Sequence, residues 1–177
     1  MGVTTELSDS ERERYAGRIE GGVGPDGQLR LKRARAMVIG AGASGSAAAA
    51  QLASCGVGYL AVVDGAAVAL RDLAGQAIYY TPDVGQSKAD TLAGKLGLLN
   101  PEVQVDSYPV ALEEQNAGPI VEGHEVVLDC THDLAVGAAL EAAGVEALRS
   151  KPGQAAGAAL GDDALEALLR SPAEALT

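Results

Sequence analysis

Residues 34–64 read ARAMVIGAGASGSAAAAQLASCGVGYLAVVD. This segment opens with a short apolar run at 35–39 and ends with a second one at 59–63. Between the two runs, a glycine-rich turn leads into an alanine-dense stretch, which Gly56 is well suited to terminate as a helix. A strand, a turn, a helix and a second strand in this order predict a βαβ unit with two parallel strands.

The glycines of this turn have the spacing of a nucleotide-binding loop. Gly40, Gly42 and Gly45 match G-x-G-x-x-G, and Asp64 ends the second apolar run 19 residues after Gly45. In such a loop the first glycine permits a tight turn, the second admits a phosphate, and the third allows close packing of helix on strand. The N–H groups at the helix start favour an anion, and Asp64 can accept hydrogen bonds from a ribose. The segment therefore predicts a Rossmann-type nucleotide site; the alternative is a glycine turn that binds nothing.

The composition indicates a core of small side chains and excludes some classes of partner. The chain has 177 residues and is 47% hydrophobic but contains no Phe and no Trp, so Ala, Val and Leu must fill the core. The net charge of −11 argues against binding nucleic acid or an anionic membrane, both of which need a basic surface. The polar N-terminus and the lack of a long apolar run predict a soluble, cytoplasmic protein.

Helical and apolar segments alternate along the chain. Residues 1–33 are expected to form a helical arm, with Ser8 and Glu11 spaced as a capping box. Residues 34–177 are expected to form a single domain. The alternation predicts an α/β, Rossmann-like three-layer fold with a mostly parallel sheet.

Further elements are expected on both sides of the βαβ unit. A helix at 87–99 should bury Leu92, Leu96 and Leu99 on one face, and Asp162 should cap a late helix. The remaining expected elements are a short helix at 28–33, a helix at 135–143, and strands at 103–108, 126–128, 146–149 and 155–160.

Several motifs occur in order between residues 10 and 145. They are Arg14-Tyr15, 24–28, 31–35, 40–46, 53–58, 72–76, 83–88, 99–101 and 128–133. Together they resemble the ThiF/MoeB (HesA) superfamily, adenylyltransferases akin to ubiquitin-activating enzymes. The resemblance implies that Mg-ATP is bound on the Rossmann half. It implies adenylation of the C-terminal carboxylate of a ubiquitin-like carrier, such as ThiS or MoaD, or of a peptide. It also implies a homodimer or a heterodimer with a paralogue.

The resemblance assigns roles to residues around the glycine loop. Asp64 matches the ribose-binding aspartate, and Lys88 matches the phosphate-binding lysine, with a solvated lysine as the alternative. Gly42 matches the loop, whereas Ala43 replaces a second glycine that is usual there.

Two further motifs depart from the family pattern. The motif that usually reads Asn-Leu-x-Arg-Gln begins at Asp72 and ends at Gln76, with Gly75 in place of its arginine. Nearby Arg71 is a candidate substitute, or a plain surface arginine. The motif that usually reads Asp-Cys-Thr-Asp-Asn begins at Asp129 and has His132 in place of the metal-binding aspartate. Histidine is a poor ligand for Mg²⁺, which weakens that part of the cofactor prediction. For Asp129 and His132 a structural role and metal binding both stay open.

The glycine loop and the motifs around it define a candidate site and leave three hypotheses for its function. Lys88 and Arg71 are the candidate catalytic residues, and Cys55 and Cys130 are expected to be small buried hydrophobes. The hypotheses are an active adenylyltransferase, a degenerate regulatory or dimerisation partner of an active paralogue, and a nicotinamide or flavin dinucleotide binder. The candidate nucleotide-contacting residues are Gly40, Gly42, Ala43, Gly45, Asp64, Asp72, Gln76, Lys88, Asp129 and His132.

Overall fold

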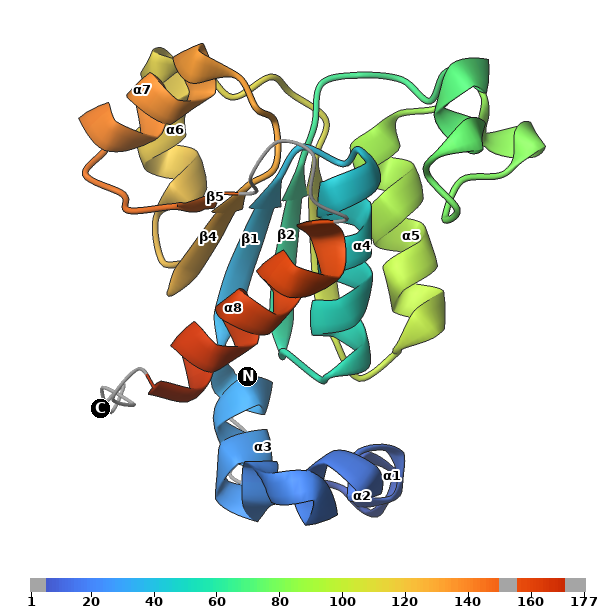
Figure 1. The fold of residues 1–177 in the computed structure, drawn as a ribbon, viewed down its shortest axis with the longest axis vertical. Coiled ribbons are helices and arrows are strands. Elements are labelled where there is room, and N and C mark those ends of the chain that lie inside the picture. Colours follow the sequence, from blue (N-terminus) through green and yellow to red (C-terminus); the bar gives the residue numbers. More distant parts are fainter. Residues whose placement is uncertain (1–5, 150–155, 171–177) are drawn as a thin grey trace.

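The chain folds around one parallel β-sheet, seen in the computed structural model of residues 6–149 and 156–170 (Figure 1). The strands are β1 (Arg35–Ile39), β2 (Tyr59–Val63), β3 (Gln104–Tyr108), β4 (Val126–Asp129) and β5 (Leu148–Arg149), in the spatial order β3-β2-β1-β4-β5. Every pairing between neighbours is parallel. The order reverses direction next to β1, which is the feature of a doubly wound Rossmann-like sheet. The predicted α/β fold class is therefore confirmed.

Side chains that alternate along the strands build two separate core regions. Ala36 and Val38 of β1 contribute to one core, and Met37 and Ile39 contribute to the other. The first core is closed by α3 (Gly24–Arg33), α4 (Ala43–Ser54), α5 (Lys88–Leu99) and α8 (Ala156–Arg170). The second is closed by α6 (Glu114–Val121) and α7 (Leu134–Ala142). A sheet covered on both faces explains why its central strands are continuously apolar.

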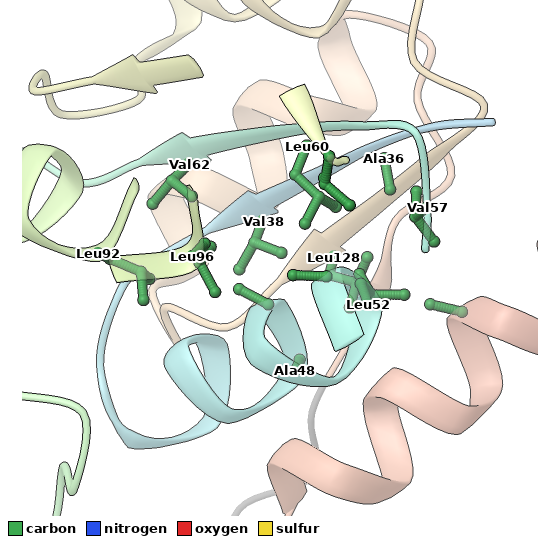
Figure 2. Close-up of a cluster of buried hydrophobic side chains, with 14 of the residues drawn as sticks. Ala36, Val38, Ala48, Leu52, Val57, Leu60, Val62, Leu92, Leu96 and Leu128 are labelled. Atoms are coloured by element: carbon green, nitrogen blue, oxygen red, sulfur yellow. The ribbon is translucent and has the colours of Figure 1, made fainter. Parts of the chain in front are cut away.

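The first core consists of aliphatic side chains from sheet and helices that meet face to face. Figure 2 shows residues of β1, β2 and β4 pointing at Ala48 and Leu52 of α4 and at Leu92 and Leu96 of α5. Leu52, Leu92 and Leu96 are fully buried. Alanines on α4 let this helix lie close to the strands, so a chain without Phe or Trp still fills its interior.

Three expectations about these helices are wrong. Leu99 is 44% exposed, because it is the last residue of α5, whereas Leu92 and Leu96 earlier in the helix are fully buried. The strand expected at 155–160 is instead the start of α8 over its described part, since an Ala- and Gly-rich run lacks the β-branched residues that favour a strand. Asp162 therefore lies inside α8 rather than at its cap, and its carboxylate accepts a hydrogen bond from the Gln51 side chain of α4.

The N-terminal arm contains α1 (Asp9–Arg14), α2 (Ala16–Arg18), a π-helical turn (Ile19–Val23) and α3. It lies at the amino-terminal edge of the sheet, opposite the glycine loop (Figure 1). The capping box predicted from Ser8 and Glu11 is present. Helix α3 begins at Gly24, earlier than expected, because Gly22 takes a φ of 123° and Pro25 then suits the first helical turn.

Buried amide side chains fasten the arm to the last turn of α4. Gln28 donates to the Cys55 carbonyl at 2.8 Å, and Asn100 donates to the Ala53 carbonyl at 2.7 Å and to the Tyr15 hydroxyl at 2.8 Å. The Cys55 carbonyl lies at the end of α4, where helix carbonyls lack helical N–H partners, so the Gln28 side chain satisfies a group that is costly to bury alone. The Ala53 carbonyl also accepts the Gly56 N–H at 3.1 Å. Four of the sequence motifs, at 14–15, 24–28, 53–58 and 99–101, therefore meet at this junction rather than at the glycine loop.

None of the helices within residues 6–149 and 156–170 combines the length and apolar character needed to cross a membrane.

The buried Glu11 carboxylate should make stability depend on pH. Glu11 is 2% exposed and accepts hydrogen bonds from Lys32 Nζ at 2.6 Å and from the Ser8 N–H at 2.7 Å. Burial alone raises the pKa of Glu11, but these hydrogen bonds outweigh it and leave the pKa below its usual value. A lowered carboxyl pKa gives stability above the unfolded-state pKa that is lost as the pH falls. Glu11→Gln should cost about 1–3 kcal/mol at neutral pH.

The difference between wild type and Glu11→Gln should narrow as the pH falls from about 5 to about 3, measured by urea unfolding at each pH. The exposed Glu13→Gln should unfold like wild type throughout. A difference for Glu11→Gln that stays constant across this range would contradict the assignment.

Candidate functional site

The glycine loop joins β1 to α4 at the carboxyl edge of the sheet, and its first and third glycines are required by the backbone. Gly40 has a φ of 90°, and a Cβ on it would lie 3.1 Å from the Cys130 carbonyl carbon. A Cβ on Gly45 would lie 1.7 Å from the Gly40 carbonyl oxygen, which no side chain can accommodate. The tight turn and the close packing predicted for these glycines are both present.

Gly42, the second glycine of the loop, lies in open space rather than against other backbone atoms. A Cβ on Gly42 would meet no atom within 4 Å, so the loop is open at this position. Gly42 is also the N-cap of α4, and no side chain caps this helix, which starts at Ala43. The N–H groups of its first turn therefore face the open side without a side-chain acceptor, as an anion-binding loop requires.

Asp64, at the end of β2, is bonded to the glycine loop itself. Its Oδ2 accepts the Ala41 N–H at 2.7 Å, and its Oδ1 accepts the Ala66 N–H at 2.7 Å. The carboxylate thus holds the loop after β1 beside the loop after β2. Each carboxylate oxygen can accept more than one hydrogen bond, so Asp64 keeps capacity for a sugar hydroxyl.

Lys88, the first residue of α5, lies beside the loop and is 9% exposed. Its Nζ is 3.0 Å from Asp72 Oδ2, in the 3₁₀ helix η2 (Leu70–Ala74). The Asp72 carboxylate also accepts the Ala69 N–H at 2.8 Å and Gln76 Nε2 at 3.1 Å. The hydrogen bond from Ala69 and the pairing with Lys88 hold the pKa of Asp72 below its usual value. Asp72 is therefore an anion throughout the neutral range.

Arg71 precedes Asp72 and has an exposed side chain, whose charge also lowers the pKa of Asp72. The structure brings Arg71 near the lysine–aspartate pair. Whether Arg71 contacts a phosphate stays a prediction.

Asp129 is the last residue of β4, and His132 follows three residues later. Cys130 and Thr131, which lie between them, pack against the glycine turn at Gly40. Asp129 is buried, and its Oδ1 accepts hydrogen bonds from the Thr131 N–H at 3.1 Å and the Thr131 hydroxyl at 2.7 Å. Its Oδ2 lies 3.6 Å from Arg149 Nε. His132 is exposed and has a φ of 57°, a conformation uncommon for residues other than glycine.

These residues do not fit a Mg²⁺ site built by the protein. The Asp129 carboxylate already accepts a hydrogen bond from the Thr131 hydroxyl and pairs with Arg149. The imidazole of His132 is a nitrogen donor, whereas Mg²⁺ prefers oxygen. Across residues 6–149 and 156–170, no three His, Cys, Asp or Glu side chains gather in a metal-binding group.

Tyr79 is part of the site but was missed in the sequence. It lies in the aperiodic segment 65–86, is 3% exposed, and donates to the Ala41 carbonyl at 2.8 Å. The same hydroxyl lies 3.4 Å from the Lys88 carbonyl oxygen, so it links the glycine loop to the start of α5. Burial raises the pKa of Tyr79, which keeps the hydroxyl a donor. Tyr79 is one of only five tyrosines in a chain without Phe or Trp, and this scarcity of aromatic residues was the available signal.

The cysteines are buried, as the sequence predicts, and neither is arranged as a nucleophile. Burial raises the pKa of Cys130 to about 12 and also raises the pKa of Cys55. Since the thiolate is the reactive form, both thiols are inert at neutral pH.

The fold and the glycine loop define a Rossmann-like α/β protein. A model of the ThiF family matches residues 15–160, and the chain belongs to that family. The molybdopterin-synthase adenylyltransferase of Escherichia coli is 36% identical over 132 residues, which cover 74% of this chain and 53% of that protein. The adenylyltransferase and sulfurtransferase UBA4 of Candida glabrata is 40% identical over 128 residues, 71% of this chain and 30% of that protein. The chain thus spans about a third to a half of these curated relatives.

Solved structures share the same architecture. The E. coli tRNA N6-threonylcarbamoyladenosine dehydratase TcdA, in complex with ATP, superposes with a TM-score of 0.74 at 25% identity, covering 83% of this chain and 63% of that one. The complex of TcdA with AMP gives a TM-score of 0.76 at 24% identity, covering 83% of this chain and 62% of that one. These neighbours bind adenine nucleotides on the fold seen here.

The close approach at Gly45 should make this position intolerant of any side chain. Gly45→Ala forces the new methyl group into the Gly40 carbonyl, so we expect a loss of about 3 kcal/mol or more and a fall in Tm of about 10 °C. Gly94→Ala is the matched control, because Gly94 lies mid-helix in α5 with no atom within 4 Å of a Cβ. It should raise the Tm slightly. A Gly45→Ala protein that melts within about 2 °C of wild type would refute the packing role.

Proposed function

We propose that this chain binds an adenine nucleotide across the glycine loop and adenylates a carboxylate at the C-terminus of a protein or peptide. The observation that carries the proposal is the uncapped start of α4 at Gly42, which lies beside the Asp64 carboxylate. The uncapped helix start suits a phosphate, and the Asp64 carboxylate suits a ribose hydroxyl. Two comparisons support this proposal. The relatives are named as adenylyltransferases, and the structural neighbour TcdA has been solved in complex with ATP and with AMP.

In this proposal each residue has a defined task. The first-turn N–H groups of α4 and the ammonium of Lys88 hold the phosphates, and Asp64 accepts hydrogen bonds from the ribose. The carboxylate oxygen of the partner attacks the α-phosphorus. The bond from that phosphorus to the bridging oxygen breaks, which yields an acyl adenylate and pyrophosphate. Catalysis rests on positioning and on cationic stabilisation of the phosphate charge, and Lys88 supplies that charge. No step is assigned to Mg²⁺, because Asp129 and His132 do not fit it.

We further propose the nature of the partner and of the assembly. The partner is the C-terminus of a ubiquitin-like sulfur carrier or of a peptide, in keeping with relatives such as the sulfur carrier protein adenylyltransferase of Thermus thermophilus. Residues 1–33 serve as an arm on a single nucleotide-binding domain at 34–177, and the chain works as a homodimer or with a paralogue.

A second candidate function is a degenerate member that supports an active paralogue. The favouring observation is Gly75: a Cβ there would meet no atom within 4 Å, and its φ of −136° suits any residue. An arginine would therefore fit, yet none is present. The one lysine beside the loop is already paired with Asp72 among the residues described.

Blocking the open side of the loop should abolish nucleotide binding without harming the fold. Gly42→Val puts a side chain where the phosphates would lie, so we expect ATP affinity to fall at least about tenfold and ATP–pyrophosphate exchange with a carrier protein to disappear. The matched control is Gly94→Val, whose side chain also enters open space but in the middle of α5 rather than at the glycine loop. Equal ATP affinity in wild type and Gly42→Val, by calorimetry, would contradict the proposed site.

Restoring the family motif separates the two candidate functions. The double variant Gly75→Arg and His132→Asp should fold normally, because Gly75 has free space and aspartate tolerates the left-handed conformation of residue 132. If wild type is the active enzyme, it should exchange pyrophosphate by itself, and the double variant should change the rate modestly. Exchange that occurs only in the double variant would favour the degenerate partner.

A further inference from the structure

The lysine that the proposed function assigns to phosphate is already held by a carboxylate. Lys88 Nζ and Asp72 Oδ2 are 3.0 Å apart, with side chains only 11% and 12% exposed. Little water screens this pair, so the attraction is stronger than between surface charges. A phosphate that approaches Lys88 therefore meets a cation whose charge is largely neutralised.

The pair lies beside the glycine loop of the proposed site. The Tyr79 hydroxyl contacts the carbonyl oxygens of Ala41 in the glycine loop and of Lys88. In addition, the Lys88 N–H donates to the Ala66 carbonyl at 2.9 Å, and the Ala66 N–H donates to Asp64. Asp72 is thus tied through its lysine to the loop that would hold the phosphates.

We infer that Asp72 is a specificity-determining residue, whose carboxylate competes with nucleotide phosphates for Lys88 and disfavours ligands with many phosphate charges. The inference deepens the proposed function and rests on it. A monophosphate, such as AMP or the phosphate of an acyl adenylate, places less negative charge near Asp72 than a triphosphate does. The site therefore discriminates against ATP and pyrophosphate more than against the adenylate group.

The structure allows this charge to be removed without damage. Asp72 accepts hydrogen bonds from Ala69 and Gln76, and the Oε1 atom of Gln76 is buried without a hydrogen-bond partner in the described part of the chain. After Asp72→Asn the amide oxygen can still accept from Ala69, and the amide nitrogen can donate to Gln76 Oε1 once the Gln76 amide flips. The substitution is therefore nearly isosteric and leaves Lys88 free to meet a phosphate.

A second aspartate in the same segment provides a matched control. Asp83 accepts the Tyr80 N–H at 2.6 Å and pairs with Lys95, which lies on α5 about two turns beyond Lys88. Asp83→Asn removes the same charge from the same kind of pair, but away from the start of α5.

The test is calorimetric titration of wild type, Asp72→Asn and Asp83→Asn with ATP and with AMP. Asp72→Asn should tighten ATP binding about tenfold and AMP binding less than about threefold, because the removed charge acts more strongly on the triphosphate. Asp83→Asn should leave the ratio of the two affinities unchanged. Should Asp72→Asn unfold, Asp72→Gln gives the same neutral charge with a side chain suited to this position of a capping box.

The outcomes separate the inference from the proposed function. ATP binding that is unchanged or weaker in Asp72→Asn, or tightened equally with AMP, would overturn the inference while nucleotide binding stands. In that case Asp72 would position Lys88 rather than compete for it. If neither nucleotide bound to any of the three proteins, the proposed function would fail, and the inference with it.

Discussion

The Asp64 carboxylate holds the ends of the two central strands in register with each other. It accepts one N–H from the loop after β1, at Ala41, and one from the loop after β2, at Ala66. The first loop leads into α4, and the second leads into the long segment between β2 and α5. The carboxylate therefore holds these two loops together at the carboxyl edge of the sheet, where the strand order reverses. Ligands bind at this point in open α/β sheets. The open start of α4 at Gly42 and the position of Lys88 beside the glycine loop both depend on this arrangement.

Local charge, rather than the field of the whole molecule, must decide what binds there. The chain carries a net charge of −11, and the described residues around the mouth include Asp64, Asp72 and Asp129 against Lys88 and exposed Arg71. An anion gains no long-range attraction to such a surface. It is bound only where N–H groups and a lysine are positioned for it, which makes the Lys88–Asp72 pair the sensitive element of the site.

Much of the fold, but less of the site, could be predicted from the sequence. The bounds of β1 and β2 were predicted correctly, because short apolar runs beside glycines are local signals. The strand expected at 155–160 was wrong over its described part, which begins α8, since an Ala- and Gly-rich run has no clear period that separates helix from strand. The pairing of Lys88 with Asp72 and the burial of Tyr79 depend on the three-dimensional path of segment 65–86. This segment has no periodic pattern of apolar residues from which that path could be predicted.

We propose that an adenine nucleotide lies across the glycine loop with its ribose on Asp64. A crystal structure of the chain grown with millimolar AMP tests this most directly. We expect electron density with the phosphate at the N–H groups of the first turn of α4 and the ribose hydroxyls at the Asp64 carboxylate. An empty loop in crystals that leave it open to solvent, or AMP bound elsewhere on the molecule, would rule out this binding site.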